Sequence, residues 1–110
     1  MALRIAFKNM EKSDNIEDFA LKKLDKIMKL VETERPPYNI DMVIHGYPTK
    51  AHNHVELIVD FANVHLFAQH EGEDIYQQID IVAKKMLDEV VKAKDKIRDK
   101  NLHEDKFKSA

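Results

Sequence analysis

Positive charge is concentrated in residues 84–100, whose sequence is KKMLDEVVKAKDKIRDK. This stretch holds seven cations and four anions, whereas the whole chain has a formal net charge of -2. On a helix, Lys85, Lys92 and Lys96 share one face, and Lys100 continues the row. Such a row suits the phosphate backbone of a nucleic acid, because each lysine that neutralises a phosphate releases condensed counterions.

A solvated helix face explains the same composition. Lysine is common on exposed helix faces, and Asp88, Asp95 and Asp99 stand at spacings that allow ion pairs with nearby lysines. The charge pattern alone therefore leaves both interpretations open.

A second group of lysines lies earlier in the chain. Lys22, Lys26 and Lys29 share one helical face, and Lys23 stands beside them. If the two helices pack side by side on a sheet, both lysine rows belong to the same outer layer. A cationic surface with two such rows suits a phosphate backbone.

His52, His54 and Glu56 occupy alternate positions of an expected strand and would point the same way. Imidazole and carboxylate donors on one face suit a divalent metal, but this stretch offers no convincing fourth ligand. The acidic run from His70 to Asp74 resembles an acidic ligand cluster, but a loop into a capped helix explains it equally well, with its acids near the helix N-terminus. We therefore expect no metal and no cofactor.

The sequence contains no arrangement that is typical of an active site. It has no nucleophile elbow, no glycine-rich phosphate loop and no cysteine. Tyr76, in the first turn of the second expected helix, suits packing as well as base stacking. We expect a protein that is not an enzyme and has no small-molecule substrate.

Alternating apolar residues and β-forming residues predict four strands, at residues 3–7, 38–45, 55–61 and 64–68. Ala62-Asn63 is expected to form a tight hairpin turn, and residues 46–50 a turn or loop. Gly72 is expected to end the last strand pattern.

Apolar residues at helical spacing predict two helices. The first begins at Ser13-Asp14, with Glu17 placed for a capping box after Asp14, and ends near Val31. The second is capped by Asp74, with Gln77 at its third position. Its apolar stripe comprises Ile75, Ile79, Val82, Ala83, Met86, Val90, Ala93 and Ile97.

The order of these elements, β-α-β-β-β-α, predicts an α+β fold with a four-stranded sheet and two helices packed on one face. Residues 1–100 are expected to form one domain, and residues 101–110 a mobile C-terminal tail. The chain shows neither a signal-peptide pattern nor an apolar run of membrane-spanning length, so we expect a cytoplasmic protein with no membrane partner.

The sequence resembles the short bacterial ribosome hibernation-promoting factors, including the closely related ribosome-associated inhibitor A. The likeness covers about residues 3–100 and is carried by EGEDIYQQID at 71–80, KK at 84–85, KAKDK at 92–96, IAFKNME at 5–11 and KKLDKIMK at 22–29. The family's fold has the same β-α-β-β-β-α order as the one read from the residues.

This resemblance implies a stress or stationary-phase protein that binds the small ribosomal subunit at the subunit interface. It would occlude the channel for messenger RNA and tRNA through contacts to ribosomal RNA phosphates, without performing chemistry. By position, the resemblance implies RNA contacts from Lys23, Lys26, Lys29, Lys85, Lys92 and Lys96, with weaker additions from Lys22, Lys94 and Lys100.

Two residues depart from the family's pattern. Asp88 stands where members often carry Arg, and Glu17 where a basic residue is frequent. Both dilute the basic surface. The C-terminal domain with which long members pair ribosomes is not expected here, so we predict a monomer when free that does not dimerise ribosomes by itself.

A non-catalytic protein-interaction module is the alternative function. It would bind a protein partner through the exposed face or an edge strand of the sheet. The apolar Ile58, on the outward side of its expected strand, is its direct support.

Overall fold

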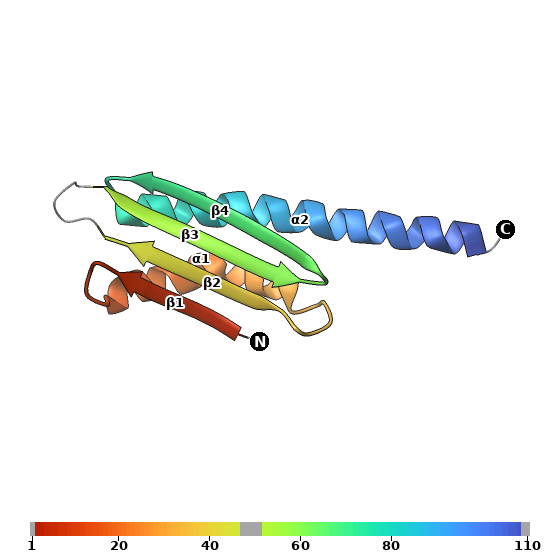
Figure 1. The fold of residues 1–110 in the computed structure, drawn as a ribbon, viewed down its shortest axis with the longest axis horizontal. Coiled ribbons are helices and arrows are strands. Elements are labelled where there is room, and N and C mark those ends of the chain that lie inside the picture. The colour runs from red at the N-terminus through yellow and green to blue at the C-terminus, as the bar shows by residue number, and fades with distance from the viewer. Residues whose placement is uncertain (1, 47–51, 109–110) are drawn as a thin grey trace.

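A four-stranded sheet with both helices on one face is the architecture of the chain (Figure 1). This computed structural model describes residues 2–46 and 52–108, with side chains described as far as Arg98 in the last helix. The elements are β1 (Ala2–Lys8), α1 (Asp14–Val31), β2 (Asn39–His45), β3 (Asn53–Phe61), β4 (Val64–Gly72) and α2 (Ile75–Lys108). The predicted fold class and element order are confirmed.

The strands are arranged in the order β1-β2-β3-β4. β1 and β2 are parallel, so the chain must cross over between them, and α1 makes this crossover. β2, β3 and β4 follow as antiparallel neighbours, with Ile44 opposite Val55 and Leu57 opposite Ala68.

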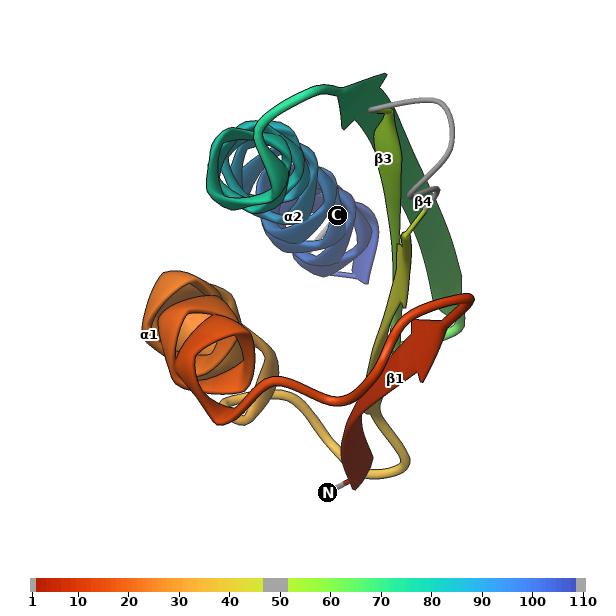
Figure 2. The ribbon, with the colours of Figure 1, turned by 90° about the vertical axis from the view of Figure 1, so that its left-hand side faces the viewer.

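The core lies between the sheet and the helices. Alternate residues of β2 and β3 are buried on the side that the two helices cover, while the opposite side of the sheet carries no helix (Figure 2). We call this uncovered side the open face. The helices contribute the buried residues Ile16, Ala20, Leu24, Ile27, Val31, Ile79, Val82, Ala83, Met86 and Val90.

Ser13 is the N-cap of α1, since its side-chain oxygen accepts a hydrogen bond from the Ile16 backbone N–H at 3.3 Å. The helix therefore begins at Asp14, one position earlier than a cap at Asp14 would require. Glu17 pairs with Lys12 at 3.2 Å, so the capping box predicted for Asp14 and Glu17 is wrong.

Asp74 caps α2 as predicted, because its carboxylate accepts hydrogen bonds from the backbone N–H groups of Tyr76 and Gln77 at 3.0 and 3.4 Å. The hairpin turn at Ala62-Asn63 is also confirmed. Both residues have positive φ, 48° and 63°, as a tight hairpin with the twist of its strands requires.

The second helix is longer than predicted, since α2 continues beyond residue 100 to Lys108 (Figure 1). The mobility of residues 101–110 stays a prediction.

Residues 47–50 of the expected loop lie outside the described residues. Gly46 is described, and its N–H donates to the Lys8 carbonyl at 2.9 Å. Within the described part of the chain, no helix combines the length and the apolar character needed to cross a membrane.

Candidate nucleic-acid interface

A lysine-lined groove runs between the two helices, which lie side by side on the sheet (Figure 2). Its volume is about 190 Å³. Four lysines line it together with Asp80, Ala83 and Leu87. We call these four the groove lysines: Lys22, Lys23 and Lys26 from α1, and Lys84 from α2.

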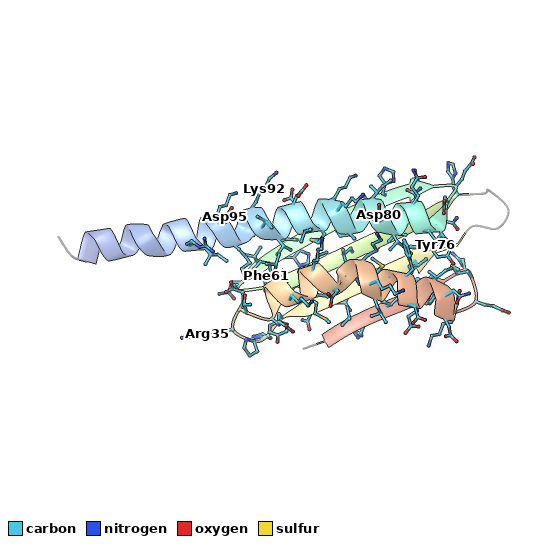
Figure 3. The ribbon with its side chains drawn as sticks, turned by 180° about the vertical axis from the view of Figure 1, so that it is seen from behind. Arg35, Phe61, Tyr76, Asp80, Lys92 and Asp95 are labelled. Atoms are coloured by element: carbon cyan, nitrogen blue, oxygen red, sulfur yellow. The ribbon has the colours of Figure 1, made fainter. Side chains whose placement is uncertain are left out.

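Asp80 holds two of the groove lysines in place. One carboxylate oxygen lies 3.0 Å from the Lys23 ammonium and the other lies 3.0 Å from the Lys84 ammonium. The two ammonium groups, first Lys84 and then Lys23, lower the pKa of Asp80 below its ordinary value. Asp80, labelled on α2 in Figure 3, is thus an anion that joins the two helices through Lys23 of α1 and also holds Lys84 of its own helix.

Aromatic residues support the same end of the groove. The Lys23 ammonium lies 5.3 Å from the centre of the Phe19 ring, within the range of a cation–π contact. Tyr76 meets Phe19 edge to face, with ring centres 5.0 Å apart. Tyr76 is therefore a packing partner of Phe19, and 40% of its surface stays exposed.

The other lysines of α1 are more loosely held. Lys29 pairs with Asp25 one turn earlier, at 3.0 Å, on an exposed part of the helix. Among the residues that the structure describes, Lys22 and Lys26 make no ion pair within the protein. Their ammonium groups are available to an external anion.

A second basic surface lies on the other side of α2, beside β4. Its lysines line two adjoining hollows that also involve Leu66 and Phe67 of β4. Lys92 lies on the side of α2 away from α1 (Figure 3). We call this set the ridge lysines: Lys85, Lys92 and Lys96.

The helix layer carries both lysine rows, but α2 separates them. The groove lysines face the space between the helices, whereas the ridge lysines face β4. The surface is therefore divided, and it is broader than the single patch that side-by-side helices suggested. Lys84 belongs to the groove although it was not among the predicted contacts.

Anions are interspersed with the ridge lysines. Asp88 and Glu89 line the same hollow as Lys85 and Lys92. Within the described side chains, neither acid forms an ion pair, and neither do the ridge lysines. Asp88 thus lies where its negative charge offsets that of the ridge lysines. Glu17, by contrast, forms an ion pair with Lys12.

Lys94 has structural partners. Its ammonium donates to the Leu30 carbonyl at 2.7 Å and to the Thr33 hydroxyl at 2.6 Å, and it lies 3.5 Å from the Glu34 carboxylate. Only 18% of its side chain is exposed. A cation at this place satisfies the last carbonyls of α1. The side chain of Lys100, also predicted as a contact, lies outside the described residues.

The groove involves two residues that sequence reasoning missed, Asp80 and Lys84. Their spacing of four residues on an expected helix indicates an ion pair, and this signal was available. That Lys23 joins the same carboxylate depends on how α1 and α2 pack, which no local pattern contains.

Residues 3–98 match the family described as Sigma 54 modulation protein / S30EA ribosomal protein. The chain belongs to this family. The resemblance read from residues 71–80 and the lysine-rich stretches is thereby confirmed at the level of the family. Membership in this family of ribosomal proteins identifies the ribosome as the partner of this chain.

Solved structures share the fold of this S30EA family member. The N-terminal domain of Protein Y from Thermus thermophilus superimposes with a TM-score of 0.67 at 22% identity, covering 82% of this chain and 96% of that one. A ribosomal subunit interface protein from Coxiella burnetii gives a TM-score of 0.67 at 21% identity, covering 86% and 98%. These likenesses support the fold.

Proposed function

We propose that this S30EA family member is a hibernation factor acting in the cytoplasm. It binds the small ribosomal subunit at the subunit interface and inhibits translation by occluding the messenger RNA and tRNA channel under stress or in stationary phase. The observation that carries the proposal is the groove between α1 and α2, which four lysines line and where one carboxylate holds two of them, in a member of a ribosomal protein family.

Electrostatics favour ribosomal RNA as the surface that the helix layer meets. The chain as a whole is net acidic, so attraction to RNA must come from local clusters of lysine. Lys22 and Lys26 are exposed and free of ion pairs in the described structure. The ammonium group of Lys23 is positioned by its ion pair with Asp80. Phosphate contacts of this kind position a protein on RNA without reading its sequence.

Occlusion requires a rigid body rather than a chemical group. The helices are fixed to the sheet by a core of fully buried side chains, among them Leu24, Ile27 and Met86. Folded protein of this kind fills a channel without rearranging, which is consistent with the absence of any predicted catalytic set. The structural relative from Coxiella burnetii is a ribosomal subunit interface protein, which supports the same location for this chain.

Competition with tRNA tests the proposal. Small subunits programmed with a short messenger RNA should lose labelled P-site tRNA when this protein is added. The loss should occur over the same range of protein concentrations in which the protein itself binds the subunit. Retention of tRNA on subunits that have bound the protein would contradict occlusion. Failure of the protein to bind at all would contradict the proposed partner as well.

Protein binding through the open face is a second candidate. Ile58 of β3 stands opposite Phe67 of β4, and 49% of the Phe67 surface is exposed. This apolar pair lies on the side of the sheet that faces away from both helices. If it recruits a partner, Ile58→Ser should abolish that interaction while leaving ribosome binding through the helix layer unchanged, because Ile58, unlike Phe67, does not line the hollow of the ridge lysines. A pull-down resistant to nuclease and salt would show this.

A further inference from the structure

Two imidazoles and a carboxylate converge on the open face where β2 meets β3. The strand register puts His45 directly opposite His54, and Glu56 lies two residues further along the same side of β3. The Glu56 carboxylate lies 3.5 Å from His45 Nε2 and 3.6 Å from His54 Nδ1. We propose that His45, His54 and Glu56 form a binding site for a divalent transition-metal ion such as Zn²⁺.

The spacing of the donor atoms fits a metal. Bonds of about 2.0–2.1 Å to a tetrahedral zinc place its ligand atoms about 3.3 Å apart. The separations from Glu56 to the two imidazoles are already within a few tenths of an ångström of this value. All three donor atoms lie within 4.8 Å of one another, so small side-chain rotations complete the geometry.

Gln69 of β4 sets the tautomer of His54. The His54 Nε2 atom lies 2.9 Å from the Gln69 side-chain oxygen, which only accepts hydrogen bonds. Nε2 therefore carries the proton, and a neutral His54 directs the lone pair of Nδ1 toward Glu56. A cation between Nδ1 and the carboxylate removes the repulsion between these two electron-rich atoms, and Gln69 acts as the outer hydrogen-bond partner typical of metal-binding histidines.

The surroundings favour a metal over bulk solvent. The side chains of His45, His54 and Glu56 are 16%, 21% and 30% exposed, and the two imidazole rings stack with centres 5.3 Å apart. A donor set of two nitrogens and one oxygen suits Zn²⁺, Ni²⁺ or Cu²⁺, whereas Mg²⁺ and Ca²⁺ prefer oxygen alone. Three protein ligands leave a fourth position for water.

This set differs from the one considered in the sequence. His52 precedes the first residue of β3 and is not among the three converging residues, while His45 comes from the neighbouring strand. The proposed ion joins β2 to β3 on the face opposite the groove and ridge lysines. Metal binding can therefore be measured without ribosomes, and its failure leaves the proposed function unaffected.

Isothermal titration of the metal-free full chain with Zn²⁺ tests the site. We expect one ion to bind in the micromolar range, and His54→Ala or the isosteric Glu56→Gln to weaken binding at least about tenfold. Gln69→Ala, which removes only the outer partner, should weaken it by about tenfold. His65→Ala, on the same face but outside the cluster, and His52→Ala are the controls and should bind as the wild type does.

Circular dichroism of each variant confirms that it is folded before titration. The absence of Zn²⁺ binding by the wild-type chain would overturn the proposal. So would unchanged affinity in both His54→Ala and Glu56→Gln, since the zinc would then lie elsewhere. Loss of binding in His52→Ala with retention in His54→Ala would contradict the proposed ligand set, because His52 and not His54 would then hold the ion.

Discussion

The groove lysines and the ridge lysines are alike in residue type and helical spacing, yet their surroundings differ. In the groove, Asp80 holds Lys23 and Lys84 at 3.0 Å, and the Phe19 ring lies under the Lys23 ammonium. On the ridge, Lys85 and Lys92 are unpaired among the described side chains and stand beside Asp88 and Glu89. On a helix wheel the two lysine rows look alike. In the folded chain, two of the groove lysines are held in place by their neighbours, whereas the ridge lysines are exposed and stand beside acidic residues that reduce the local positive charge.

If the helix layer binds RNA as proposed, preorganisation should decide which row contributes more. A lysine that is already held in place loses less conformational freedom when it meets a phosphate, so more of the contact energy remains as affinity. The neighbouring acids of the ridge repel the same phosphates. We therefore expect the groove to contribute more than the ridge.

Reversing charge in the groove should give the largest effect. The double variant Lys23→Glu with Lys26→Glu should weaken binding to the small subunit by about 100-fold at moderate salt, because repulsion would replace two of the proposed phosphate contacts. The double variant Lys8→Glu with Arg35→Glu makes the same change in net charge away from both rows and should bind nearly normally. Equal losses in both variants would mean that net charge, not the groove, drives binding.

The ridge should respond less strongly. Lys92→Glu combined with Lys96→Glu should weaken binding by about tenfold and reduce its dependence on salt, since both side chains are exposed and the fold is unaffected. Filter binding over a salt series measures both quantities. If this variant lost more affinity than the groove variant, the ridge lysines and not the groove lysines would contribute more to binding.

Lys94 should matter for stability rather than for RNA. Lys94→Met removes the donor to the Leu30 carbonyl and leaves Glu34 without its partner, which should lower the free energy of unfolding by about 1–2 kcal/mol. Lys96→Met, at an exposed position, should change it by less than about 0.5 kcal/mol. Chemical denaturation measures the free energy of unfolding of both variants. Weaker RNA binding by a folded Lys94→Met variant would instead place Lys94 in the RNA interface.

Asp80 should give the smallest effect, and one that depends on pH. Its pKa is lowered in the folded state, so the unfolded chain takes up its proton at higher pH, and the stabilisation is present above the ordinary value of 3.8 and lost as pH falls below it. Asp80→Asn should therefore cost about 0.5 kcal/mol at neutral pH, because both lysines are partly solvated.

The difference between wild type and Asp80→Asn should narrow as pH falls below 3.8, which denaturation at a series of pH values tests. A difference that grows in acid would mean that the carboxylate is not the partner of Lys23 and Lys84.

Features fixed by local chemistry could be predicted from the sequence. The first helix ends at Val31 as expected, because its apolar spacing stops there and Pro36 follows closely. The Ala62-Asn63 turn and the Asp74 cap are equally local. The Ser13 cap lies within the predicted Ser13-Asp14 start, and only the choice between these two residues was left open, since Ser and Asp both cap helices well.

Features that depend on two distant elements could not be predicted in this way. The pair of His45 with His54 follows from the register between β2 and β3, and the place of Lys94 follows from where α1 ends beside α2. The extension of α2 to Lys108 has no apolar period to indicate it. It rests on the helix propensity of residues such as Leu, Glu and Lys.

Sedimentation with purified bacterial small subunits tests the central claim most directly. The wild-type protein should pellet with the subunits at about 50 mM salt and be released progressively as the salt rises to about 200 mM, because the proposed contacts join lysines to phosphates. A protein that remains in the supernatant at the lower salt concentration, while folded, would contradict the account.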